Sequence, residues 1–249
     1  MEAESRTEST ARDRAGAAYD ALADRVEVRV QGALNHLSPS VKPKLRGWLH
    51  LGAVPITGLM CLALLVAADD TADRAAVAVY TLTTLLLFSV SALYHRGSWS
   101  PAMDGFLRRL DHANIFLIIA GTYTPYAVLL LEPDRARLLL ILVWTGAAAG
   151  VFFRMFWLGA PRWAYVAAYL ALGWVALFFI QDLVRAGGWV ILTLMLTGGL
   201  LYTAGAVVYA TKKPDPSPRW FGYHEVFHAL TIGAWLAFYI GIAVSLARA

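Results

Sequence analysis

The sequence has few charged residues for a chain of its length. Only 15% of the 249 residues are charged and 59% are hydrophobic, whereas about a quarter of the residues are charged in an ordinary soluble domain. A soluble domain of this composition would expose far more apolar surface than water tolerates. Disorder, collagen-like repeats and a coiled coil are excluded by the same composition. The sequence therefore predicts an integral membrane protein.

The sequence also has almost no cysteine, and it lacks a stretch in which basic and aromatic residues are interleaved. The single cysteine, Cys61, lies inside an apolar run, which excludes a disulfide framework and a thiolate metal site. The isoelectric point is about 9.3, but no basic stripe interleaved with aromatic residues supports nucleic-acid binding. The net charge of +4 fits loops that face an anionic membrane surface.

Seven apolar runs are each long enough to cross a bilayer, whose hydrocarbon core needs about 20 helical residues. They cover residues 47–68, 75–94, 113–131, 138–158, 163–181, 189–210 and 224–246. We therefore expect an all-α bundle of seven transmembrane helices over residues 47–249. Residues 1–46 hold 15 of the 38 charges and form a cytoplasmic segment, with a disordered start and no cleaved signal peptide. An amphipathic, membrane-surface helix is expected over about residues 14–37.

Basic residues are unequally shared between the two sides of the predicted bundle. Sixteen Lys and Arg lie in the N-terminal segment and the loops on its side, and five lie on the opposite side. Because basic loops stay in the cytoplasm, the N-terminus is expected inside and the C-terminus outside. Arg outnumbers Lys by 17 to 4, which together with many alanines indicates a GC-rich bacterial source and hence an inner-membrane location.

Ionisable residues at the edges of the apolar runs are the candidates for a functional site, because such residues are costly there. Ser91 and His95 lie four residues apart at the end of the second run, and Asp111 opens the third. His224 and His228, also four apart, open the last run. Residues at this spacing share one helix face, and the topology places all five at the cytoplasmic edge. Three imidazoles with an open fourth position form the ligand set of a catalytic zinc.

This order of S-x3-H, Asp in the next span and H-x3-H in the last span resembles the hemolysin III family. That family is the bacterial branch of the adiponectin and progestin receptor superfamily, and it is distantly similar to the alkaline ceramidases. The resemblance covers about residues 45–249 and includes three stretches: LYHRGSW, LDHANIFLIIAGTYTP and WFGYHEVFH. It implies zinc on His95, His224 and His228. It also implies that Asp111 holds the attacking water as a catalytic residue and that Ser91 is a second catalytic residue beside it.

The predicted function is zinc-dependent hydrolysis of a lipid amide or ester, with a membrane lipid entering sideways between the helices. The alternatives are a non-catalytic receptor or membrane-stress sensor with structural zinc, and the cytolysin that the family name suggests. His224–His228 also spells H-E-x-x-H, the zinc-protease signature with Glu225 as base. No Asp, Glu or His follows His228 to supply a third ligand, so an intramembrane metalloprotease is less favoured.

All four lysines lie in polar segments, which excludes a retinal protein.

Several candidate residues also have purely structural interpretations. Asp111 could only cap the N-terminus of its helix, and Ser91 could only bond its own backbone. His36 and His50 favour packing or interfacial roles. His112 points about 100° away from Asp111 around its helix, which favours a structural role in contact with a neighbouring loop.

Overall fold

All regular secondary structure in the described residues is helical. The computed structural model describes residues 43–157 and 159–248. The elements are α2 (Trp48–Ala67), α3 (Thr71–Arg96), α4 (Pro101–Leu130), α5 (Pro133–Phe156), α6 (Arg162–Gly173), the 3₁₀ helix η1 (Trp174–Phe179), α7 (Ile180–Thr211) and α8 (Tyr223–Leu246). Within these residues the only β pairing is an isolated bridge, so the predicted all-α class is confirmed. The predicted surface helix over 14–37 lies outside the described residues.

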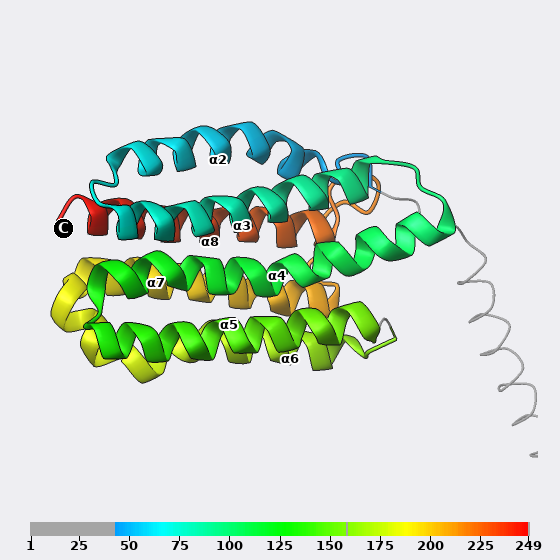
Figure 1. Ribbon diagram of the computed structural model, residues 1–249. Coiled ribbons are helices and arrows are strands. Elements are labelled where there is room, and N and C mark those ends of the chain that lie inside the picture. The colour runs from blue at the N-terminus through cyan, green and yellow to red at the C-terminus, as the bar shows by residue number, and fades with distance from the viewer. Residues whose placement is uncertain (1–42, 158, 249) are drawn as a thin grey trace, which may run out of the picture. The chain divides into compact units, whose positions relative to one another are not determined.

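Within the described residues, six helical stretches are long and apolar enough to cross a membrane. Five of them, α2 to α5 and α8, correspond one to one with predicted spans. The sixth is the 50-residue stretch Arg162–Thr211, which contains both remaining predicted spans, 163–181 and 189–210. Its backbone leaves helical geometry at Gly188, with φ 69° and ψ −177°, and the chain changes direction in this yellow part of the ribbon (Figure 1).

Helix α4 begins about three turns before the predicted start at residue 113. Ser100 is its N-cap, and the Ser100 hydroxyl accepts a hydrogen bond of 3.4 Å from the backbone N–H of Met103. Pro101 follows at the first helical position, where its missing N–H leaves no intrahelical bond unmade. Asp111 therefore lies inside the helix. The interpretation of Asp111 as a helix cap is wrong.

The bundle buries its middle and exposes large apolar side chains on its outside. In the most apolar 18-residue stretch of α4, 67% is buried inside the bundle, whereas the corresponding share is 28% in α2 and in α5. The exposed side chains include Leu59 and Val66 on α2 and Phe156 on α5. Such faces would be unfavourable in water, and they fit hydrocarbon. Together with the membrane-length helices, they describe a multi-pass membrane protein.

One end of the bundle brings together the helix ends that carry the candidate site. Helix α3 ends there, whereas α4 and α8 begin there (Figure 1). Helix α4 contacts both α3 and α8. Residues that are far apart in the sequence, such as His95 and His224, therefore lie at the same level of the bundle.

Candidate metal centre

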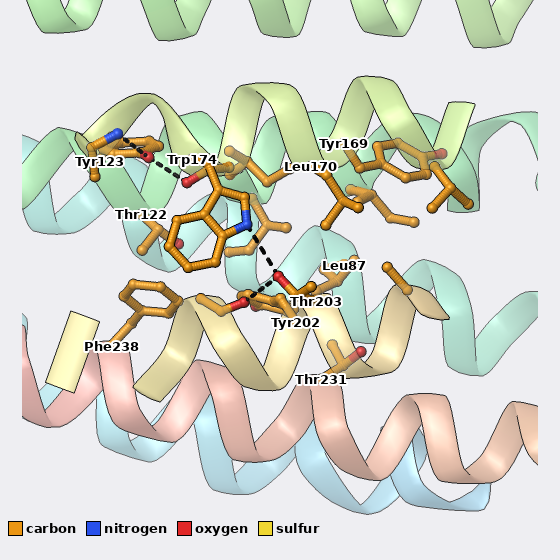
Figure 2. A pocket seen from close by; sticks show the side chains of 18 of the residues that line it. Leu87, Thr122, Tyr123, Tyr169, Leu170, Trp174, Tyr202, Thr203, Thr231 and Phe238 are labelled. Carbon is orange, nitrogen blue, oxygen red and sulfur yellow. Dashed lines mark hydrogen bonds between the residues drawn. The ribbon is translucent and has the colours of Figure 1, made fainter. Parts of the chain in front are cut away.

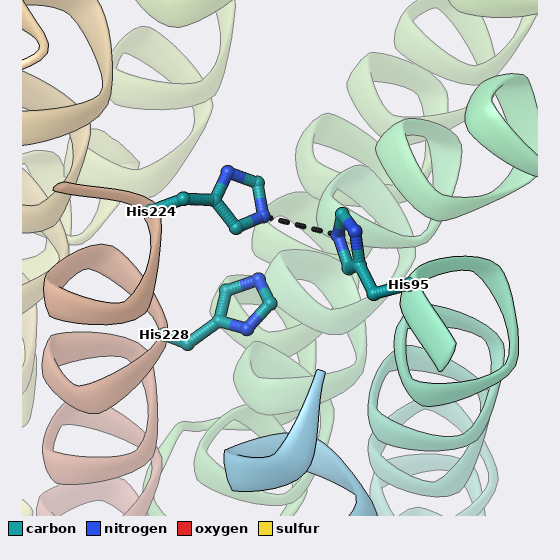
Figure 3. Close-up of side chains that lie close together, drawn as sticks. All are labelled: His95, His224 and His228. Carbon is teal, nitrogen blue, oxygen red and sulfur yellow. Dashed lines mark hydrogen bonds between the residues drawn. The ribbon is translucent and has the colours of Figure 1, made fainter. Parts of the chain in front are cut away.

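Three histidines from two helices form a compact, buried cluster. His95 comes from the end of α3, and His224 and His228 come from the first two turns of α8 (Figure 3). One ring nitrogen from each lies within 4.8 Å of the others, and the Nε2 atoms of His95 and His224 are 3.0 Å apart. The His95 side chain is 8% exposed, and His228 is 2% exposed. The structure thus brings together the three predicted ligands.

The cluster suits a metal ion that prefers imidazole nitrogen. Zinc–nitrogen bonds of about 2.0–2.1 Å in a tetrahedral site place two ligand atoms about 3.3 Å apart, close to the separation of the His95 and His224 nitrogens. His228 Nδ1 is buried and has no hydrogen-bond partner. A buried polar atom without a partner costs free energy. A metal ion bound to a histidine ring nitrogen would remove this cost for that nitrogen. Imidazole sites of this kind hold zinc and its neighbours in the first transition row.

The start of α2 packs directly against two of these histidines. His50 stacks on His228, with ring centroids 3.7 Å apart and planes 8° apart. Gly47 adopts φ 80°, and a Cβ added there would lie 2.8 Å from the Cβ of His95. Only glycine combines this backbone conformation with such a close approach. The sequence interpretation of His50 as a packing residue did not place it beside the cluster.

Glu225, the acid of the H-E-x-x-H match, already has partners on both carboxylate oxygens. Arg46 Nε donates to Glu225 Oε1 at 2.5 Å, and the backbone N–H of Gly222 donates to Oε2 at 2.8 Å. The residue is fully buried and lies in the first turn of α8. This arrangement anchors the start of the helix that carries His224 and His228, which is the role of a first-turn acid.

Asp111 and Ser91 lie next to the histidine cluster. Asp111 Oδ2 is 3.8 Å from His95 Nε2, and the Ser91 side chain interacts with the Asp111 carboxylate. Ser91 lies one helical turn before His95 on α3 and is 2% exposed. Ser91, Asp111, His224 and His228 all line one cavity. All five residues singled out by their spacing therefore meet at one place.

Comparison with known proteins identifies the family of this chain. The model of the Haemolysin-III related family matches residues 40–239, which is most of the chain. The chain belongs to this family. It is 30% identical to Hemolysin-3 of Bacillus cereus over 185 residues, which cover 74% of this chain and 81% of the relative. It is 28% identical to the Hemolysin-3 homolog of Bacillus subtilis (strain 168) over 167 residues, covering 67% and 75%.

The cavity of this haemolysin III-related chain is long and mostly apolar. Along α4 its lining runs from Asp111 to Tyr126, a distance of about 22 Å at 1.5 Å per residue. Figure 2 shows apolar and aromatic side chains around it, with Trp174 in the middle. The Trp174 indole N–H donates to Thr203 Oγ1 at 3.1 Å, so this polar group already has a partner. The cavity is therefore longer than the hydrocarbon part of one membrane leaflet, which is about 15 Å thick.

His112 is not one of the three histidines whose ring nitrogens converge, which agrees with the structural role favoured by its position on the helix. Its contacts are made with helices and not with a loop. Arg154 Nη2 of α5 lies 2.6 Å from His112 Nδ1, and the ring stacks on Tyr165 of α6 at 5.7 Å. The sequence analysis assigned no role to Arg154. Its position inside the apolar stretch VFFRMF is the signal that could have found it, because a charge within an apolar span needs a reason to be there.

Proposed function

We propose that this chain is a zinc-dependent hydrolase that cleaves an amide or ester bond of a membrane lipid. The observation that carries the proposal is the position of the three-histidine cluster. His224 and His228 line the end of an apolar cavity inside a membrane bundle, beside Asp111 and Ser91. An apolar cavity that ends at a carboxylate and a metal-binding cluster suits a substrate with a hydrocarbon chain and a hydrolysable head.

Each residue has a defined part in this proposal. Bound zinc would supply a Lewis acid that polarises the substrate carbonyl and lowers the pKa of water. Asp111 lies next to the cluster without being one of its three imidazole donors, so it is placed to take a proton from water and return it to the leaving group. The Ser91 hydroxyl, next to Asp111, is placed to donate a hydrogen bond to the developing oxyanion. The cavity would hold the acyl chain and keep bulk water out.

Two measurements on one preparation test the proposal. Elemental analysis of the purified protein should find about one zinc per chain, and an untargeted screen of membrane lipids should find one amide or ester class consumed. Zinc without turnover of any lipid would favour the non-catalytic receptor or sensor. Lysis of vesicles without turnover would favour the cytolytic activity that the names of the two Bacillus relatives suggest. Absence of metal would contradict the zinc site itself.

The proposed topology has seven crossings, with Arg162–Thr211 crossing twice on either side of Gly188. Fifteen Lys and Arg lie in residues 43–248, and ten of them belong to the segments at the end that carries the histidine cluster. By the positive-inside rule this end faces the cytoplasm, as does the N-terminal segment 1–46.

A reporter fused after Ala249 is therefore expected to lie outside the cytoplasm. Alkaline phosphatase at this position should be active, and green fluorescent protein should be dark. The same pair of reporters inserted between α7 and α8, within residues 212–222, should give the opposite signals. Cytoplasmic signals from both positions would show that the last helix does not cross or that the count of seven is wrong.

A further inference from the structure

A second cavity, of about 330 Å³, is lined by His95 and His224 of the histidine cluster and by His112. Four arginines line it: Arg46, Arg108, Arg154 and Arg162. Asp111 is the only acidic residue among the described residues that line it, and it lies on the side of the cluster. Arg46 is already paired with Glu225. The remaining arginines make this cavity strongly positive.

Arg154 is the most unusual of these residues. It is 2% exposed, and its Nε and Nη1 atoms have no hydrogen-bond partner. None of the ion pairs within residues 43–157 and 159–248 includes it. A guanidinium stays charged at any ordinary pH, so it cannot escape the cost of burial by losing its proton. Among the described residues, Arg154 is thus a buried cation without an anionic partner.

The neighbours of Arg154 orient it but do not neutralise it. Arg154 Nη2 donates to His112 Nδ1 at 2.6 Å, so His112 accepts at Nδ1 and carries its proton on Nε2, 3.4 Å from the Tyr209 hydroxyl. The guanidinium also lies 4.4 Å from the ring centroid of Tyr165, a favourable cation–π distance. Neither a neutral imidazole nor a phenol ring supplies a negative charge.

Arg162 repeats the pattern on the same cavity. Its Nη1 atom is buried and has no partner, and its guanidinium lies over the ring of Tyr209 at 5.5 Å. Together with Arg154 it offers three unpartnered donor atoms. Two planar guanidinium groups present N–H donors that match the oxygens of a phosphate group. A phosphate monoester has three terminal oxygens, one for each unpartnered donor.

The two cavities meet, which places this cationic site relative to the apolar one. Asp111, His112, Tyr165, Tyr209 and His224 line both. A molecule that filled both cavities would have its hydrocarbon among the apolar residues and its anionic group at the arginines. The bond that joins the two parts would lie beside Asp111 and His224.

We propose that Arg154 and Arg162 bind the phosphate group of a single-chain phospholipid whose hydrocarbon occupies the apolar cavity. Placing the acyl bond of that lipid at Asp111 and His224 rests on the proposed hydrolase function. Binding of the phosphate does not, because Arg154 and Arg162 are neither among the three candidate metal ligands nor among the residues proposed to act in hydrolysis.

Binding of two ether-linked lipids tests this without any turnover. The probes are 1-O-alkyl-glycerol 3-phosphate and the 1-O-alkyl-glycerol of the same chain length, neither of which has an ester to cleave. The full-length protein in detergent should bind the phosphate-bearing lipid at least about tenfold more tightly, because its phosphate gains charge-assisted hydrogen bonds. Equal binding of the two lipids would overturn the proposal, whatever the outcome of the hydrolysis screen.

Variants show whether the arginines cause the preference. Arg154→Met and Arg162→Gln should each bring binding of the phosphate-bearing lipid close to that of the neutral one. Arg162→Gln keeps the test valid if Arg154→Met fails to fold. The matched control is Arg135→Gln at the opposite end of the bundle, where Arg135 pairs with Asp182, and it should leave the preference unchanged.

The source of the phosphate is tested separately. Inorganic phosphate should compete with the lipid only weakly, because it cannot use the apolar cavity. Binding of inorganic phosphate as tight as that of the lipid would overturn the headgroup assignment. A preference that survives both arginine substitutions would show that the phosphate binds elsewhere.

Discussion

Replacing His228 with alanine is expected to remove the metal from the purified protein. The three imidazoles of His95, His224 and His228 are the proposed protein ligands, so the variant would retain two ligands from different helices. Loss of even an outer-shell partner of a metal ligand costs about 10–100-fold in affinity, and loss of a direct ligand should cost at least about 100-fold. Elemental analysis of wild type and His228→Ala, purified side by side, measures the effect.

His50→Phe is the matched control for this experiment. His50 is buried and stacks on His228, but it is not among the three histidines whose nitrogens converge. Phenylalanine keeps an aromatic ring of similar size against His228, so metal content should stay close to that of wild type. If His50→Phe loses metal as completely as His228→Ala, His50 belongs to the ligand set and the three-ligand assignment is wrong.

The membrane-length helices were predictable because the bilayer fixes their length. An apolar run of about 20 residues has few other folds available, and α2, α3, α5 and α8 each begin and end within a few residues of the prediction. The first turns of α4 were not predicted as helix, because Pro101 to Leu110 contains three charged residues and no apolar run. The Ser100-Pro101 pair was the available signal, since it caps the helix that extends beyond the apolar part.

The cluster of three histidines was also predictable, for a different reason. The spacing of His224 and His228 fixes their relative position on one helix, and the alternation of spans fixes which helix ends meet. Contacts that depend on side-chain packing between helices were not predictable in this way. The stacking of His50 on His228 and the position of Arg154 against His112 are set by how α2 and α5 pack, and no local spacing encodes either.

Replacing Asp111 with asparagine is expected to abolish most turnover while leaving the metal in place. Asparagine keeps the shape of the side chain and can still form hydrogen bonds, but it cannot take up a proton. Loss of a general base typically lowers the rate by about 10²–10⁴-fold. Because the three imidazoles are unchanged, zinc content should remain close to that of wild type. The measurements are zinc content and the rate of hydrolysis of the lipid found by the screen.

Glu225→Gln is the comparison that separates this mechanism from a protease-like one. The Glu225 carboxylate accepts hydrogen bonds from Arg46 and from the backbone of Gly222, so its loss should weaken the start of α8 and lower thermal stability. Turnover per folded molecule should change little, because both oxygens are engaged away from the substrate. If Glu225→Gln keeps its zinc but loses activity while Asp111→Asn stays active, Asp111 is not the base. The H-E-x-x-H interpretation would then describe the chemistry better, with Glu225 released from Arg46 when substrate binds.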